Sequence, residues 1–597
     1  MLNVFDRFCT AQASALALVR IGDGGKRSAV VPGRLPTTPA LVLTLTLALA
    51  ACASGPSAPR AHVAAPLLAA TVGAPTARPA ATSRTAADAV ARDRGVAGSA
   101  DLEADLPLRP LPALTATLAV ELGQLQRLSF GVNGSLLTAA EAQGGVDAWL
   151  DHQLHPGPDD GLPVEVSQRL QGMRIRQEPL EPLVLGIERQ RREAKALSRD
   201  SERKAVLDHL RETANQIGRE AQLELLWRET YSTWQVQELL TAFWCNHFSI
   251  FLSKGDVPLV AADYVDHAIR PHVLGHFTEL LRATARHPAM LRYLDNERNA
   301  AGHLNENFAR ELLELHTLGV DGGYTQKDVQ ELARTLTGFG VYVGNDTNRA
   351  ARPGTDGWRR DALFEYNPAR HDFGEKTVLG ERVHARGYGE FEEVLNRLAR
   401  HPATIHHVSV QLATFLLGEA PPADLLEQMR ATWVETDGDL RRLTLVVVHS
   451  PAFQASLMRG FKSPQRYVVG GLRLAYEDRP VLNMQPALNW LNRMQHAPLA
   501  RVTPDGYPLL SAGWTAPGQF ATRFDIARQL GFGSAGLFRP EGSKGEEQAA
   551  FPQLATAFYY RALEPGLSMG TRQSLAHARS PQEWSLLLLS SPEMMRY

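Results

Sequence analysis

Helical periodicity dominates the chain beyond Pro110 and most constrains what it can fold into. Between Asp200 and Arg228, apolar residues recur at spacings of three and four, namely Val206, Leu210, Ala214, Ile217 and Ala221. Such a stripe predicts an amphipathic helix that buries one face and leaves its charges in solvent. Strand-like runs are few, at 339–343 (FGVYV) and 377–379. We therefore expect a mainly α protein with minor β, built as a large multi-helix globular body.

A second helix is predicted after the tetrapeptide Ser232-Thr233-Trp234-Gln235. This pattern is that of a capping box, in which a hydroxyl accepts a backbone hydrogen bond at the helix start and an amide returns one. The helix would align Val236, Leu240, Phe243 and His247 on one stripe. That alignment favours a hydrogen-bonded core histidine at His247, although a functional role stays open.

The front of the chain contains an uncharged run, Ala40 to Ala51, that follows several basic residues. It is shorter than the roughly 20 apolar residues that a bilayer-spanning helix needs, and it has the proportions of a signal-peptide core. It ends in Leu-Ala-Ala-Cys52, which resembles the lipobox of bacterial lipoproteins, where the cysteine is acylated and becomes the new N-terminus. We predict a lipoprotein signal segment over 1–51 and lipidation of Cys52. The alternative is an ordinary secretory signal with a chance cysteine.

Residues 52–110 are dominated by Ala, Pro, Thr, Ser, Gly and Arg. This composition buries too little apolar surface to offset the entropy of ordering, so a disordered, flexible tether is predicted. The helical body would then occupy 111–597, held away from a membrane surface. We expect a cell-envelope location with a lipid anchor. Ala53 lacks an acidic retention signal, which by resemblance to enterobacterial lipoproteins favours the outer membrane.

The charge of the chain argues against a nucleic-acid partner, and its cysteine content argues against stabilisation by disulfides. The chain has 62 basic and 64 acidic residues and a net charge of -2, so it has no electropositive footprint for nucleic acid. Its three cysteines are Cys9, Cys52 and Cys245. Lipidation of Cys52 and removal of the signal would leave Cys245 without a partner. We therefore expect a fold stabilised by its core and not by disulfides, with Cys245 as an inert core thiol.

A helix-loop-helix is predicted over Asn305 to Phe339, with the sequence NENFARELLELHTLGVDGGYTQKDVQELARTLTGF. Gly319 is a natural helix stop, and Thr325 with Asp328 matches a capping-box variant at the start of the second helix. The first helix has an apolar stripe of Phe308, Leu312 and Leu315. Beside it lies a charged row of Glu306, Arg310 and Glu314 at ion-pair spacing.

At this hairpin the chain resembles the bacterial domain-of-unknown-function 1800 family. Five blocks carry the likeness: Arg127 to Gly131 with Ala148 to Leu154, Phe243 to Phe248 (FWCNHF, with Cys245 where histidine is more usual), Asn305 to Phe339, His371 to Lys376 with Leu379 and Gly380, and Phe461 to Pro464 with Gly513 and Trp514. The likeness covers roughly 125 to 597. It implies a large, exported, mainly helical protein, often encoded beside a second exported family, domain-of-unknown-function 1501. It implies no agreed activity.

The polar residues of those blocks are the candidates for chemistry. Imidazoles and carboxylates from separate segments can bind a divalent metal and activate water, or act as general acid and base. The candidate metal ligands are His247, Glu311, Glu314, His316 and His371. The candidate catalytic residues are His371, Asp372, His247 and Glu311. No HExxH, paired CxxC, GxSxG or P-loop pattern supports them, so purely structural roles stay open for each.

Two functions remain as hypotheses from the sequence. The first is an exported envelope lipoprotein that binds or scaffolds, attached to the membrane through Cys52 and partnered with a protein of the domain-of-unknown-function 1501 family. It rests on the anchor, the tether and the missing catalytic signature. The alternative is a metal-dependent or acid/base hydrolase of an envelope or extracellular polymer. It rests on the density of histidine, asparagine and carboxylate in the recognised blocks.

Overall fold

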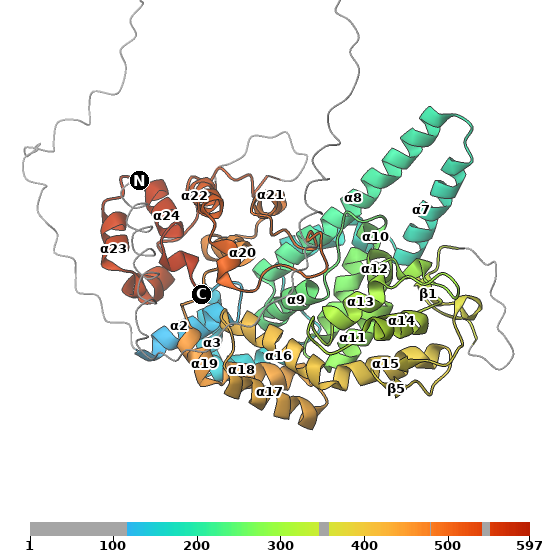
Figure 1. Ribbon diagram of the computed structural model, residues 1–597. Helices are drawn as coiled ribbons and strands as arrows, with labels where there is room; N and C mark the ends of the chain where they lie inside the picture. The colour runs from blue at the N-terminus through green and yellow to red at the C-terminus, as the bar shows by residue number, and fades with distance from the viewer. Residues whose placement is uncertain (1–115, 345–356, 478, 540–549) are drawn as a thin grey trace, which may run out of the picture. The chain divides into compact units, whose positions relative to one another are not determined.

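The computed structural model describes residues 116–344, 357–477, 479–539 and 550–597 (Figure 1). The chain divides into two units, Met1–Asp105 and Leu106–Tyr597, and every described residue belongs to the second. The predicted signal segment, Cys52 and the tether lie outside the described residues. Within the described part the fold is mainly helical with few short strands, which confirms the predicted class.

The helices of the first part lead up to the FWCNHF block. In chain order they are α2 (Ala116–Arg127), α3 (Gly134–Ala142), α4 (Val146–Gln153), α5 (Val164–Gln171), α6 (Arg174–Gln177), α7 (Leu180–Lys195), α8 (Asp200–Tyr231) and α9 (Gln235–His247). The predicted long helix is confirmed as α8, and four of its five stripe residues are buried, Leu210, Ala214, Ile217 and Ala221. With α7 it forms a charged two-helix hairpin (Figure 1).

The predicted capping box at Ser232 is wrong. Ser232 follows the last residue of α8, and α9 begins at Gln235 without a side-chain cap. The Ser232 hydroxyl accepts from the Trp234 amide at 3.1 Å, which shapes the connection between the two helices. The Gln235 side chain instead donates to the Ser232 carbonyl at 2.8 Å. The Gln235 Oε1 accepts from the Phe130 amide at 3.3 Å, so the amide side chain is used elsewhere and does not return the bond that the capping box requires.

The middle of the chain contains short helices and all the strands. The helices are α10 (Val257–Asp263), the π-helix η1 (Tyr264–Ile269), η2 (Arg270–His272), α11 (Phe277–Arg286), α12 (Pro288–Tyr293), η3 (Asn296–Arg298), α13 (Asn307–Glu314), α14 (Gln326–Thr335), η4 (Pro368–Arg370) and α15 (Tyr388–Arg400). The strands are β1 (Phe339–Val341), β2 (Arg359–Asp361), β3 (Phe364–Tyr366), β4 (Thr377–Val378) and β5 (Glu381–Arg382).

The predicted hairpin is confirmed as α13 and α14. Thr325 and Asp328 form the capping box that starts α14. The first helix ends earlier than predicted, at Glu314, and Gly319 follows with a φ of 89°. Both strand-like runs contain strands. In the sheet β3 lies between β1 and β2, with antiparallel pairs such as Phe339 with Tyr366, and β4 pairs with β5.

The last part is helical again. Its elements are α16 (Pro402–Leu417), α17 (Ala423–Thr436), α18 (Leu440–Val448), α19 (Pro451–Ser456), α20 (Pro464–Ala475), α21 (Gln485–Arg493), η5 (Ser511–Trp514), α22 (Pro517–Gly531), η6 (Tyr559–Leu563), η7 (Glu564–Gly566), α23 (Met569–Ala576), α24 (Pro581–Leu589) and η8 (Glu593–Met595). Among the described helices, none combines the length and the apolar character that crossing a bilayer would require.

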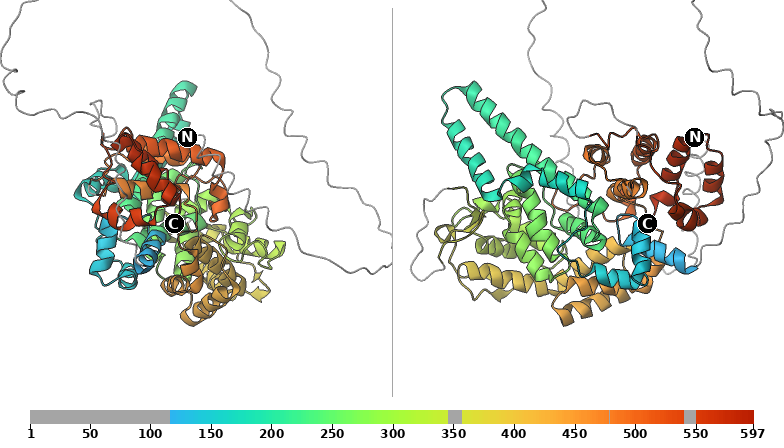
Figure 2. Two further views of the ribbon diagram at one scale, coloured as in Figure 1. Left: turned by 90° about the vertical axis from the view of Figure 1, so that its left-hand side faces the viewer. Right: turned by 180° about the vertical axis from the view of Figure 1, so that it is seen from behind.

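Two clusters of buried apolar side chains form the core. The larger takes residues from α2 to α4, from α7 and α8, and from elements between α9 and α19. The smaller is built by the C-terminal helices α20 to α24 with α5 and one face of α8. Figure 2 shows these C-terminal helices, coloured orange to red, beside α8, and α20 and α21 contact that helix. The border between the two clusters is where the candidate site lies.

Candidate functional site

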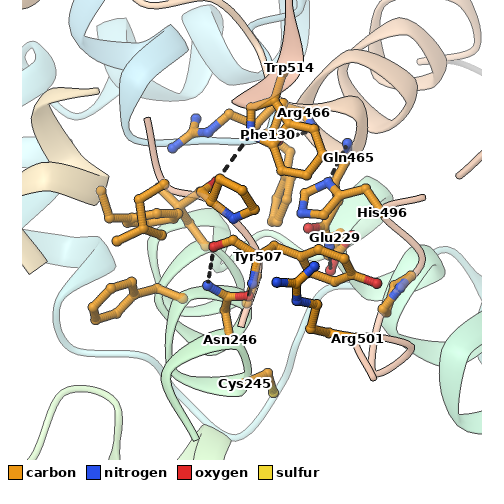
Figure 3. Close-up of a pocket in the computed structure, with 18 of the residues that line it drawn as sticks. Phe130, Glu229, Cys245, Asn246, Gln465, Arg466, His496, Arg501, Tyr507 and Trp514 are labelled. Carbon is orange, nitrogen blue, oxygen red and sulfur yellow. Dashed lines mark hydrogen bonds between the residues drawn. The ribbon is translucent and has the colours of Figure 1, made fainter. Parts of the chain in front are cut away.

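A pocket opens where the two hydrophobic clusters meet (Figure 3). It is partly open to solvent, and its walls are mostly apolar. The opening block of the family resemblance contributes Phe130, the FWCNHF block contributes Phe243, Cys245 and Asn246, and the closing blocks contribute Phe461, Ser463 and Trp514. Mostly apolar pockets with a few convergent polar groups are the default binding-site candidates.

One wall is the loop before η5, which Asn246 fastens to α9. The Asn246 Nδ2 donates to the Tyr507 carbonyl at 3.0 Å, and its Oδ1 accepts from the Tyr507 amide at 2.6 Å. Gly506 has a φ of 71°, and a Cβ there would lie 2.4 Å from the Asn246 carbonyl oxygen. The close approach therefore requires glycine, because any side chain would push the loop off the helix.

Glu229 is the buried acid of the pocket. It lies on α8 and is 1% exposed. Its Oε1 accepts from the Gln465 Nε2 at 2.6 Å, while its Oε2 has no hydrogen-bond partner among the described residues. Burial raises the pKa of Glu229 to about 8, with Glu238 adding to the shift. At neutral pH the side chain is therefore mainly a neutral carboxylic acid.

His496 is held beside it by the same residue. The Gln465 backbone amide donates to the His496 Nδ1 at 3.3 Å. The imidazole ring packs against Tyr507 and Trp514, each with a centroid distance of 4.4 Å. Burial lowers the pKa of His496 to about 3, so the ring is neutral. Because Nδ1 accepts, the proton of the neutral ring is on Nε2.

Glu229 should make stability depend on pH. Its pKa is about 8 in the folded protein against an ordinary 4.5, so between those values the folded state keeps a proton that the unfolded chain releases. The contribution of this proton to the free energy of unfolding is fully present below pH 4.5 and is lost as the pH rises towards 8. Glu229→Gln should remove this loss, so its free energy of unfolding should rise relative to that of the wild type by up to about 1.4 kcal/mol for each pH unit of that window.

Urea unfolding of both proteins at about pH 5 and about pH 9 measures this difference. The exposed Glu435→Gln is the control; equal pH slopes in wild type and Glu229→Gln would contradict the assignment.

Cys245 lines the same pocket and is only partly buried. Burial of the thiol raises its pKa well above the ordinary value, and Glu229 and Glu238 add to the effect. A thiol is nucleophilic only as the thiolate. The group is therefore unreactive, as the sequence predicted, although it faces a pocket and not a closed core.

Two buried arginines join the opening block to the end of the chain, next to the pocket. Arg127 donates to the carbonyls of Leu417 and Ser456 and, at 2.9 Å, to that of Tyr597. Arg466 donates to the carbonyls of Arg127 and Ser129 at 3.2 and 3.0 Å. The Tyr597 ring packs on both guanidinium groups. These contacts fix the wall that contains Phe130.

The structure brings two predicted site residues, His247 and His316, together with a third histidine. The ring centroids of His247 and His316 lie 6.2 Å apart, and His407 lies 6.2 Å from His247. The His247 Nε2 lies 3.2 Å from the His316 carbonyl oxygen, so a hydrogen-bonded core histidine is confirmed. Burial lowers the pKa of all three, that of His316 to about 3. His407, from α16, had no signal in the sequence.

Glu311 and Glu314 share the partly exposed side of α13. The Glu314 Oε2 accepts from the Tyr324 hydroxyl at 3.0 Å. Burial and the neighbouring Glu314 raise the pKa of Glu311, and Asp505 of the pocket loop contributes to the same shift. Neither carboxylate lines the pocket.

His371 and Asp372 belong to a separate, buried network. The Asp372 carboxylate accepts from the Arg334 Nε at 2.9 Å, and this bond lowers the pKa of Asp372 to about 2. The His371 Nδ1 lies 2.8 Å from the Thr337 carbonyl oxygen. Lys376 and Glu390 form a buried ion pair at 2.6 Å, with the His371 Nε2 3.4 Å from that carboxylate. This network holds the loop against α14 and α15, so its residues have a structural role.

The five candidate metal ligands are therefore not assembled into one centre. His247 and His316 are neighbours, Glu311 and Glu314 are neighbours, and His371 lies in the network with Glu390. Across residues 116–344, 357–477, 479–539 and 550–597, no three His, Cys, Asp or Glu side chains are grouped so as to hold a metal ion.

Sequence reasoning missed the polar residues of that pocket. Glu229 lies one position past the predicted end of a helix whose charges suggested solvent. Gln465, His496 and Tyr507 belong to no motif, and Gln465 meets Glu229 across 236 positions of sequence. The sequence contained only an indirect signal. The recognised blocks, which lie far apart in the chain, contain aromatic residues that line the pocket in the structure.

Comparisons with known proteins agree with the resemblance of the five blocks. A family model described as "Protein of unknown function (DUF1800)" matches residues 124–596. No curated protein matches the chain, and no solved structure does. The matched range begins within α2, ends one residue before Tyr597 and includes every other residue that lines the pocket. The chain belongs to the DUF1800 family.

Proposed function

We propose that this protein is an exported, lipid-anchored binding protein of the cell envelope, and that the pocket between α8, α9 and the C-terminal helices is its binding site. The observation that carries the proposal is convergence: three blocks separated by hundreds of residues meet on one mostly apolar pocket. The lipid on Cys52 would attach it to a membrane, in keeping with the outer-membrane or periplasmic location expected from the sequence. A protein of the domain-of-unknown-function 1501 family is proposed as a companion.

Binding fits the chemistry of the pocket better than catalysis. The thiol of Cys245 stays protonated because burial raises its pKa. His496 is a weak base because burial lowers its pKa to about 3. A mostly apolar pocket with a few neutral polar groups has the composition typical of a ligand-binding site.

A plug in the pocket tests this function. Ala242 lines the pocket from α9 and is partly exposed, so Ala242→Phe should fill it with little effect on the core. We expect wild-type protein to bind the apolar probe ethylbenzene, detected by saturation-transfer NMR, and Ala242→Phe to lose roughly tenfold or more in affinity. Ala431→Phe, on the exposed side of α17, is the matched control. Equal binding by all three proteins, or by none, would refute the pocket as the site.

An acid/base hydrolase of an envelope polymer is the second candidate. The observation in its favour is that the pocket pairs a protonated carboxyl, Glu229, with a neutral imidazole, His496, and acid–base sites separate pKa values in this way. It requires that purified protein release soluble fragments from isolated envelope polymers and that Glu229→Gln abolish the release. Release that is unaffected by this variant would place any such activity elsewhere.

A further inference from the structure

The polar groups of the pocket define what kind of ligand it can take. We propose that the pocket recognises an uncharged carbonyl-bearing molecule with an apolar body, whose oxygen accepts hydrogen bonds from the Glu229 carboxylic acid and the His496 Nε2. This inference rests on the proposed binding function and names the chemical class of its ligand.

The first donor is Glu229, whose position is fixed. Its Oε1 is held by Gln465 at 2.6 Å, so the carboxyl plane cannot turn freely. Its Oε2 is buried and has no partner in the described structure. A buried polar group left without a partner costs free energy, and a ligand oxygen would remove that cost. In the neutral form, the acid offers one hydroxyl proton for this bond.

The second donor is His496, tied to the same Gln465. Because its Nδ1 accepts from the Gln465 amide, its Nε2 carries a proton. No hydrogen bond to this Nε2 is found within the described residues. Gln465 therefore positions both donors, through its side chain and its backbone, and Figure 3 shows Glu229, Gln465 and His496 among the residues that line the pocket. Both donors are neutral, and two neutral donors suit an uncharged acceptor.

The cations of the pocket wall are partly engaged. Arg501 pairs with Asp505 at 3.0 Å. Arg466 donates to two backbone carbonyls, and its guanidinium lies 4.4 Å from the Tyr597 ring centroid and 5.4 Å from that of Phe415. The Arg466 Nη2 has no partner and is buried, as is the Glu229 Oε2. An anionic probe therefore has to be compared with an uncharged one, because Arg466 would favour the anion and the two neutral donors would favour the uncharged acceptor.

The apolar walls set the rest of the ligand. The wall residues include Phe130, Phe243, Phe415, Phe461 and Trp514. Aromatic side chains favour an aromatic or flat aliphatic body by offset or edge-to-face packing. A small aryl ketone therefore represents the class, and an alkylbenzene of the same shape lacks only the acceptor.

Matched probes test the inference on the full chain. Acetophenone should bind roughly tenfold more tightly than ethylbenzene, as one or two net hydrogen bonds would give. Benzoate and benzylamine should bind more weakly than acetophenone. Glu229→Leu should remove the preference for acetophenone, whereas Glu229→Gln, which keeps a donor amide, should retain it. Above about pH 8 the wild type should lose the preference as Glu229 ionises, while Glu229→Gln should not.

Different outcomes would contradict the carbonyl preference and the proposed binding function. Equal affinity for acetophenone and ethylbenzene would overturn the carbonyl inference while leaving an apolar binding site. Tighter binding of benzoate would also overturn it, in favour of Arg466 as an anion receptor. Binding of none of the four probes would overturn the proposed function itself. The charged groups that act on Glu229 are Glu238 of α9, which raises its pKa, and Arg270, which lowers it. If the pH effect arises at Glu229, Glu238→Gln should therefore move the loss of the preference for acetophenone to a lower pH.

Discussion

Replacing Arg127 with leucine is expected to lower the free energy of unfolding by about 3–5 kcal/mol. The side chain is fully buried, and its guanidinium donates to backbone carbonyls at Leu417, Ser456 and Tyr597. Leucine would remove this donor from all three carbonyls, of which that of Ser456 would keep only the Arg459 amide at 3.2 Å. Each buried acceptor left without a donor costs about 1–3 kcal/mol. The midpoint of urea unfolding, followed by tryptophan fluorescence, measures the loss.

Two further variants show whether the geometry or merely the charge matters. Arg127→Lys keeps the charge but has a single ammonium in place of the forked donors, so it should recover only part of the loss. Arg430→Leu, an exposed arginine paired with Glu427, should leave the midpoint unchanged. A loss in Arg127→Leu no larger than in Arg430→Leu would show that the buried hydrogen bonds do not stabilise the fold.

Replacing Cys52 with alanine is expected to release nearly all of the protein from membranes. Two acyl chains on a cysteine give stable anchoring, whereas without them nothing in the described part of the chain supplies a membrane-spanning helix. Fractionation of cells expressing the full chain should show the membrane-bound share falling by roughly tenfold or more. Mass spectrometry of the wild type should find a lipid-modified N-terminus at residue 52.

The other cysteines are the controls for this experiment. Cys9 precedes the predicted cleavage point, and Cys245 lies on α9, so Cys9→Ala and Cys245→Ala should fractionate like the wild type. A mature protein that starts elsewhere, or one that carries no lipid, would remove the anchor from the proposed function. The pocket and its ligand class would be unaffected, because they depend only on the folded body.

Local signals explain how much of the fold was predictable. The stripe on α8 and the capping box of Thr325 and Asp328 depend on residues a few positions apart, so the sequence contains the whole interaction. The capping box predicted at Ser232 failed because its side chains make other bonds. The Ser232 hydroxyl accepts from the nearby Trp234 amide, and the Gln235 Oε1 accepts from the amide of Phe130, which is 105 positions away in the sequence.

The recognised blocks predicted important residues but not their roles. Asp372 looked like a candidate for chemistry, yet it forms an ion pair with Arg334, and His371 completes a network around Lys376 and Glu390. A histidine or carboxylate in a loop has the same sequence appearance whether it meets a substrate or an arginine. Only the partner distinguishes the two, and the partner lies elsewhere in the chain.

By itself the sequence determined the helical class, the central hairpin and the family, and it supports the predicted anchor, because these depend on short-range periodicity and motifs. Only the tertiary structure decided that Glu229, Gln465 and His496 share a pocket with Phe130 and Trp514. The physical reason is that burial makes the acid neutral, and that the Gln465 amide, from another helix, places the imidazole proton on Nε2. Burial is a property of the packed helices, and no stretch of sequence contains it.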